Sequence, residues 1–169
     1  MLDQIWVSRA SFQYGLCLAL FVVALIKGAM PEKLLSGALV GAIVADLLYH
    51  AVIGSTSYAN LELGHATQDI VLFAISWAIA LRANRVYPLW IAGAQLISVT
   101  SHVYRAAFEH IHPVVYAVMM RLPFYVNVLA LLLGLTAHIR RTARIGKYPS
   151  WRGYSDRFWA PPPRPRPSG

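Results

Sequence analysis

The sequence contains almost no cysteine and little charge. Cys17 is the only cysteine among 169 residues, so an intrachain disulfide is impossible and a cluster of thiolate metal ligands is excluded. Charged residues make up 13% of the chain and apolar residues 57%, against about 25% and roughly 45–50% in soluble domains. A soluble domain of this length could not bury so much apolar surface. The scarcity of charge therefore indicates a protein that lies in a lipid bilayer.

The charge that is present is mostly positive and lies near the C-terminus. The net charge is +8, and eight of the fifteen Lys and Arg residues follow Ile139. A basic run directly behind a hydrophobic segment is typical of a membrane-topology signal and of contact with anionic lipid. We therefore expect membrane lipids as partners rather than nucleic acid, and headgroup contacts from Arg140, Arg141, Arg144 and Lys147.

Five hydrophobic stretches are long enough to cross a bilayer, which requires about 20 mostly apolar residues. They are Ala10–Ile26, Leu34–Ile53, Leu63–Leu81, Val86–Tyr104 and Val114–Ile139. The first carries no A-x-A cleavage site after its apolar run, so we interpret it as a retained helix rather than a signal peptide. The sequence thus predicts an all-α, polytopic membrane helix bundle of about five transmembrane helices.

Basic residues in the connections predict which side of the membrane each connection faces. The first connection contains Lys27 and Lys33 and the third contains Arg82 and Arg85, whereas the second, 54–62, contains no Lys or Arg. Cytoplasmic connections carry the excess of Lys and Arg. This alternation predicts a multi-pass protein with its N-terminus outside and its C-terminus in the cytoplasm.

Composition divides the chain into two parts. Residues 1–139 are predicted to form the transmembrane bundle. Residues 140–169 form a basic tail rich in Pro and Arg, which cannot build a core and is expected to be a disordered cytoplasmic segment. A docking peptide for a cytoplasmic partner is the alternative for this tail.

Ionisable residues inside apolar segments cost several kcal/mol each in lipid, so each needs a partner or a function. Asp46 and His50 lie four residues apart on one face of the second segment, and His65 and Asp69 form the same pair in reverse order on the third. In an antiparallel hairpin the pairs reach matching depths, with the histidines roughly 3–5 Å and the aspartates roughly 9–11 Å inside the outer ends. The spacing predicts a polar cluster near the outer face.

The fourth and fifth segments extend this predicted cluster. The fourth presents a polar stripe within an arc of about 80°, which comprises Gln95, Ser98, His102, Arg105 and Glu109. In the fifth, Arg121 lies about 10 Å below the outer end, at the depth of the aspartates, and is expected to neutralise one or both of them. His110 and His112 complete the outer connection, whereas His138 lies at the opposite end and is expected to contact lipid headgroups.

Three interpretations of this cluster stay open. The pattern favours a non-catalytic polar network in a scaffold or accessory subunit, made by Asp46, Asp69, Arg121, Gln95 and Ser98. The alternative is a divalent-metal or haem site in a membrane hydrolase or redox enzyme, with ligands among His50, His65, His102, Asp46 and Asp69. The third is a component of a proton or ion transporter. The sequence leaves open enzymatic activity and whether the partner is another membrane protein or a second copy of the chain.

Several short stretches are similar to a set of small bacterial multi-pass membrane proteins with no known activity. They are Ala83–Trp90 (ANRVYPLW), Gln95–His102 (QLISVTSH), Ile111–Ala117 (IHPVVYA) and Tyr148–Arg152 (YPSWR). The resemblance covers most of the chain and implies residence in the bacterial inner membrane. Its motifs are not diagnostic of an activity, so no functional residue is carried over from it.

Overall fold

Five helices make up the computed structural model, which describes residues 2–53, 63–107 and 113–153. They are α1 (Leu2–Lys27), α2 (Met30–Ile53), α3 (Leu63–Arg82), α4 (Tyr87–Ala107) and α5 (Pro113–Ile145). Each hydrophobic segment predicted from the sequence coincides with one helix. Among the described residues, the only pairing of β type is a single bridge between Ala83 and Trp151. The all-α prediction is confirmed.

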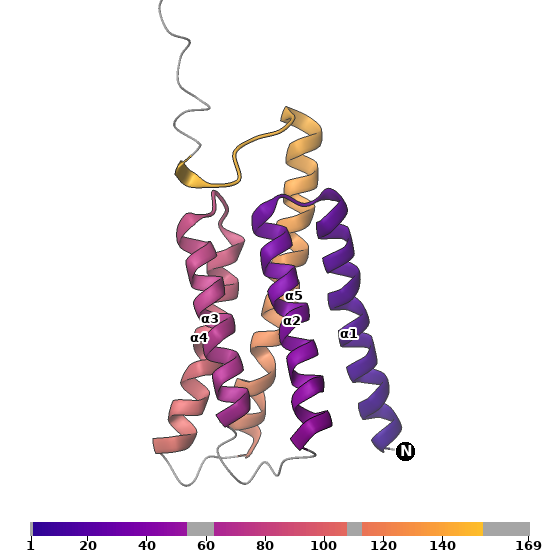
Figure 1. Cartoon of the computed structure of the whole chain (residues 1–169), viewed down its shortest axis with the longest axis vertical. Helices are drawn as coiled ribbons and strands as arrows, with labels where there is room; N and C mark the ends of the chain where they lie inside the picture. Colours follow the sequence, from indigo (N-terminus) through magenta and orange to yellow (C-terminus); the bar gives the residue numbers. More distant parts are fainter. Residues whose placement is uncertain (1, 54–62, 108–112, 154–169) are drawn as a thin grey trace, which may run out of the picture.

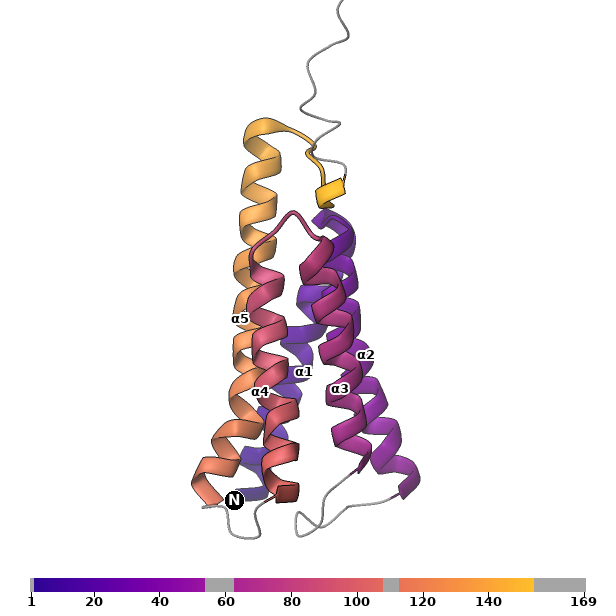
Figure 2. The same ribbon diagram turned by 90° about the vertical axis from the view of Figure 1, so that its left-hand side faces the viewer.

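The helices lie side by side, and successive helices run in opposite directions (Figure 1). One end, which we name the histidine end, contains the C-termini of α2 and α4 and the N-termini of α3 and α5. The other, the basic end, contains the connections 28–29 and 83–86 and residues 146–153 (Figure 2). α4 packs most closely against α5 and α3, and α2 packs between α1 and α3.

Three of the helices are long and apolar enough to cross a membrane, judged by length and composition. They contain the segments Met30–Val52, Gly64–Arg82 and Arg121–Ile145. In α1, the apolar stretch Ser11–Lys27 is shorter. Large apolar side chains point outward along the bundle, among them Ile26, Val52 and Leu133, which are exposed by 74%, 83% and 59%. Such a surface fits a lipid environment, while the predicted number of five spans stays a prediction.

Capping interactions at the basic end define where α2 begins and where α5 ends. Glu32, in the first turn of α2, accepts a hydrogen bond from the backbone N–H of Ala29 at 3.1 Å, as the acidic member of a capping box does. Gly146 follows α5 with a φ of 76°, and its N–H donates to the carbonyl of Thr142 at 2.9 Å. This left-handed conformation is the usual helix terminator, and glycine adopts it without strain.

Apolar side chains fill the space between the helices. The buried core includes Leu20, Ala24, Leu35, Leu39, Ile91, Leu131 and Leu135. Gly134 allows α5 to approach α4 closely, because a Cβ at this position would lie 2.4 Å from the ring of Tyr87. This contact holds the first turn of α4 against α5 at the basic end.

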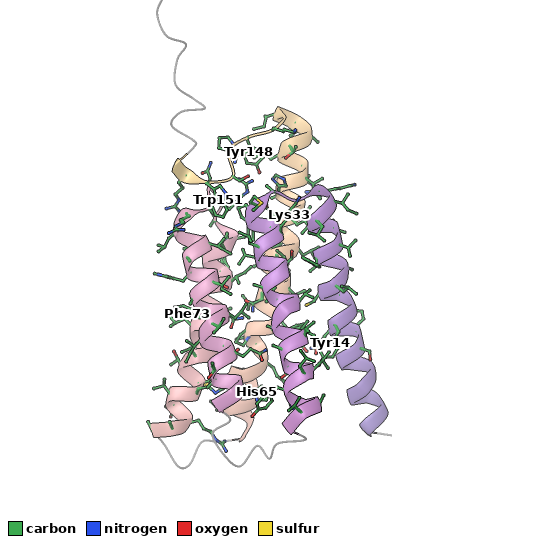
Figure 3. The ribbon with its side chains drawn as sticks, in the orientation of Figure 1. Tyr14, Lys33, His65, Phe73, Tyr148 and Trp151 are labelled. Carbon is green, nitrogen blue, oxygen red and sulfur yellow. The ribbon has the colours of Figure 1, made fainter. Side chains whose placement is uncertain are left out.

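The chain beyond α5 returns across the basic end of the bundle. α5 continues past the predicted boundary at 139, which therefore falls inside a helix. The backbone N–H of Asn84 donates to the carbonyl of Ser150 at 2.9 Å, and Figure 3 shows Tyr148 and Trp151 over the ends of the helices. This segment is part of the folded bundle, and the rest of the predicted tail lies outside the described residues.

Candidate functional site

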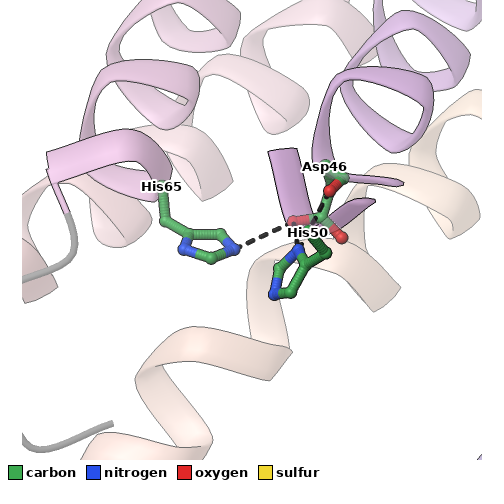
Figure 4. A group of neighbouring side chains, drawn as sticks. All are labelled: Asp46, His50 and His65. Carbon is green, nitrogen blue, oxygen red and sulfur yellow. Dashed lines mark hydrogen bonds and ion pairs between the residues drawn. The ribbon is translucent and has the colours of Figure 1, made fainter. Parts of the chain in front are cut away.

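A carboxylate and two imidazoles meet between α2 and α3 at the histidine end. Oδ1 of Asp46 lies 2.9 Å from Nε2 of His65 and 3.6 Å from Nδ1 of His50. Nδ1 of His50 also lies 2.9 Å from the backbone carbonyl oxygen of Asp46. Both rings therefore direct a nitrogen at the same aspartate, as Figure 4 shows.

Packing around these rings fixes their orientation. The ring of Tyr49 lies 5.8 Å from that of His50 and 5.5 Å from that of His65, edge-on in both cases. Gly64 makes room for Tyr49, because a Cβ at Gly64 would lie 2.5 Å from the tyrosine ring. Gln68, one turn further along α3, donates to a backbone carbonyl of α2 at 2.8 Å. The two helices are thus held at the spacing that brings the imidazoles together.

The three side chains have the composition and spacing of a metal site. One ligand atom from each of Asp46, His50 and His65 lies within 4.8 Å of the other two. Around a tetrahedral zinc ion with bonds of about 2.0–2.1 Å, ligand atoms lie about 3.3 Å apart, so small side-chain rotations suffice to bind an ion. These side chains are exposed by 29%, 40% and 24% respectively. That exposure leaves a face open for a water ligand.

A second Asp–His pair lies between α3 and α4. Nε2 of His102 and Oγ of Ser98 lie 2.9 and 2.8 Å from Oδ2 of Asp69. Ser98 and His102 are four residues apart and so share one face of α4. The pair offers one imidazole and one carboxylate, whereas zinc sites use at least three protein ligands. Its geometry suits a hydrogen-bonded link between the two helices.

The polar residues predicted from the sequence are therefore divided between two sets of contacts, each of which joins neighbouring helices. Gln95 is buried on α4, with an exposed fraction of 4%, and Arg121 is exposed on α5. Asp46 and Asp69 bond imidazoles and a hydroxyl, and their neutralisation by Arg121 stays a prediction. Outside the described residues lie Glu109, His110 and His112.

Another polar cluster lies at the basic end and centres on Glu32. This carboxylate is fully buried, with an exposed fraction of 0%. Its Oε1 accepts a hydrogen bond from Nε of Arg85 at 3.2 Å, and its Oε2 accepts the bond from the N–H of Ala29. The side chain of Arg85 is itself only 7% exposed. A buried ion pair thus joins the first turn of α2 to the connection between α3 and α4.

The segment after α5 completes this basic-end cluster. Nδ1 of His138 accepts hydrogen bonds from Nη2 of Arg85 at 3.2 Å and from the hydroxyl of Tyr148 at 2.9 Å. The guanidinium groups of Arg85 and Arg141 lie 4.3 and 4.4 Å from the centre of the Tyr148 ring, within the range of cation–π attraction. Burial raises the pKa of the Tyr148 phenol above its usual 10.0. The phenol therefore keeps its proton and donates a hydrogen bond to the imidazole.

The expectation that His138 contacts lipid headgroups is wrong, because this side chain is buried, with an exposed fraction of 8%. The prediction rested on its position near the end of a hydrophobic segment, which does not show which way a side chain points. Glu32 and Arg85 were also outside the predicted cluster. Their opposite charges, in two connections assigned to the same side of the membrane, are the signal that could have found the pair.

Comparison with known proteins leaves the family of this chain open. No protein-family model, curated protein or solved structure matches it. Function must therefore be inferred from the geometry of the clusters at the two ends of the bundle.

Proposed function

We propose that this chain is an integral membrane protein that binds one divalent transition-metal ion through Asp46, His50 and His65. The observation that carries the proposal is the convergence of these three ligand atoms, from two helices, within 4.8 Å. The apolar helices support the membrane assignment. An ionised carboxylate in lipid also needs a counter-charge, which a neutral imidazole does not supply and a bound cation does.

The chemistry of the three side chains favours zinc or a similar ion. Neutral imidazole suits zinc, copper, iron and nickel, whereas calcium and magnesium prefer all-oxygen sites. Haem fits less well, because both rings aim at one carboxylate oxygen instead of facing each other across a gap. Three protein ligands with an open fourth position are typical of catalytic zinc sites. A metal-dependent membrane hydrolase is therefore the enzymatic form of this proposal.

Metal analysis of matched variants tests the site. The protein is purified in detergent without chelator and incubated with zinc, and the bound metal is measured by mass spectrometry after desalting. We expect about one ion per chain in the unmodified protein and a loss of at least tenfold in affinity in His50→Gln, because a ligand is removed. His50 is a suitable target because it is the most exposed of the three side chains.

His102→Gln is the control for that experiment, because it makes the same change at an imidazole that also bonds an aspartate. It is expected to keep the bound zinc. A metal-free unmodified protein, or equal zinc losses in both variants, would contradict the proposed site.

A helix clamp in an accessory or scaffold subunit is the second candidate function. Its support is that Asp46–His65 and Asp69–His102 link α2 to α3 and α3 to α4 with no ion required. Under this proposal both Asp–His pairs contribute to stability alike, and chelators leave the unfolding transition unchanged. Under the metal proposal, chelator lowers the unfolding temperature of the unmodified protein but not that of His50→Gln. Transport of protons or ions stays a prediction.

A further inference from the structure

A pocket opens at the basic end between α4 and α5, far from the proposed metal site. Its volume is about 750 Å³. Polar groups gather at its mouth, where the structure places Arg85, Arg141, Tyr148 and Arg152. The rest of its lining is largely apolar and includes the exposed side chains of Trp90, Leu129 and Leu133. Polar side chains at one part of the lining and apolar side chains at the other match an amphiphilic ligand.

The apolar part continues along the same two helices toward the histidine end. A second pocket of about 600 Å³ shares Val86, Trp90 and Val126 with the first and extends to Ile97 and Leu122. From Val86 to Ile97 the helical rise is about 16 Å. One leaflet of the hydrocarbon core, half of about 30 Å, has the same depth. The two adjoining pockets, which we name the α4–α5 groove, therefore extend together over the length of one acyl chain in one leaflet.

The charge at the mouth of the groove selects an anionic headgroup. Arg85, Arg141 and Arg152 line the first pocket. Among the described residues of the basic-end cluster, the one carboxylate is that of Glu32, and it is paired with Arg85. Arg141 is exposed and lies over the ring of Tyr148, so its guanidinium is held at the rim. Arginine binds phosphate oxygens with two parallel hydrogen bonds. The rim thus has an excess of positive charge suited to a phosphate.

We propose that the groove between α4 and α5 binds a phospholipid with a net negative headgroup, the phosphate at Arg141 and one acyl chain along Trp90, Leu129 and Val126. A free phosphate ion would leave the apolar groove unfilled. A neighbouring apolar helix would instead place the exposed guanidinium of Arg141 against hydrocarbon, at a cost of several kcal/mol. The site is independent of the proposed metal ion, because the two lie at opposite ends of the bundle.

Lipid retention by matched variants tests this site. The full-length protein in detergent is mixed with anionic phosphatidylglycerol or zwitterionic phosphatidylcholine carrying the same acyl chains, and bound lipid is counted by native mass spectrometry. We expect preferential retention of the anionic lipid. Arg141→Gln is expected to weaken that retention about fivefold, since one arginine near a lipid surface contributes about 1 kcal/mol. Arg82→Gln, the same change at an exposed residue of the basic end that lines neither pocket, is expected to leave retention unchanged.

Two further arms separate headgroup recognition from groove binding. Ala137 is exposed and lines the pocket, so Ala137→Trp is expected to fill the groove and exclude the lipid without disturbing the core. Inorganic phosphate at millimolar concentration is expected not to displace the bound lipid. Equal retention of both lipids with equal effects of Arg141→Gln and Arg82→Gln overturns the proposal. Full displacement by phosphate, or a dimer that covers the groove in place of lipid, overturns it as well.

Discussion

The ion pair between Glu32 and Arg85 makes a quantitative prediction about stability. Glu32 is 0% exposed and its carboxylate accepts one hydrogen bond from Arg85 and one from a backbone N–H. Arg85→Leu removes the cation that is paired with this buried carboxylate and is expected to lower the free energy of unfolding by about 3–5 kcal/mol. Replacing both Glu32 and Arg85 by leucine leaves no unpaired charge in the core. The double variant is therefore expected to be more stable than Arg85→Leu alone.

Reversible unfolding in mixed detergent micelles, followed by circular dichroism, measures these differences. Arg82→Leu serves as a control, because Arg82 is an exposed residue of the same end of the bundle and its loss is expected to change stability by less than about 0.5 kcal/mol. A double variant as unstable as the sum of the two single variants would refute the reasoning, since it would mean that the two side chains do not interact. An Arg85→Leu variant that matches the control would refute it equally.

The remaining predictions concern packing, protonation and the second Asp–His pair. Gly134→Ala is expected to cost about 1–3 kcal/mol, because its Cβ would lie 2.4 Å from the Tyr87 ring; Gly15→Ala, with open space around it, is the control for thermal unfolding. The pKa of Tyr148 is raised in the folded protein. The stability that this phenol contributes is therefore complete below its unfolded-state pKa of about 10 and is lost as the pH rises through its higher folded-state pKa. Tyr148→Phe is expected to remove this contribution to the alkaline dependence of unfolding, measured between about pH 9 and 12. Asp69→Ala leaves a histidine and a serine donor on α4 without their acceptor and is expected to cost about 1–3 kcal/mol in the micelle unfolding assay; an unchanged midpoint would show that these bonds add no stability.

Hydropathy and helical periodicity were sufficient to predict the five helices, because each apolar segment is long and bounded by Gly, Pro or charge. They were not sufficient to prove five crossings. α4 carries the polar stripe from Gln95 to Arg105. The helices that are long and apolar enough to span a membrane are α2, α3 and α5. Burial of that stripe against α3 and α5 explains how a less apolar helix fits in the bundle. Only the packing, which the sequence does not contain, reveals this.

The candidate site was predictable in part for a similar reason. The i,i+4 pairing of Asp46 with His50 is a local relationship that sequence spacing alone shows. The contact between Asp46 and His65 depends on the register of α3 against α2, which Tyr49 and Gly64 set through side-chain packing. The basic-end cluster could not be assembled from spacing, because it joins residues from α2, the 83–86 connection, α5 and the segment after it. Contacts of that kind have no periodicity to detect.

The separation of the two ends has a consequence for how the protein would meet its ligands. Positive charge at the basic end predicts that this end faces the cytoplasm, where anionic lipid is attracted to basic side chains. The proposed metal ligands lie at the other end of α2 and α3, so they face the outside of the cell if that orientation holds. An ion would then enter from the external solution, through the exposed face of His50, without crossing the bilayer. The lipid groove and the metal site would in that case act on opposite leaflets, and a variant at one site should leave binding at the other unchanged.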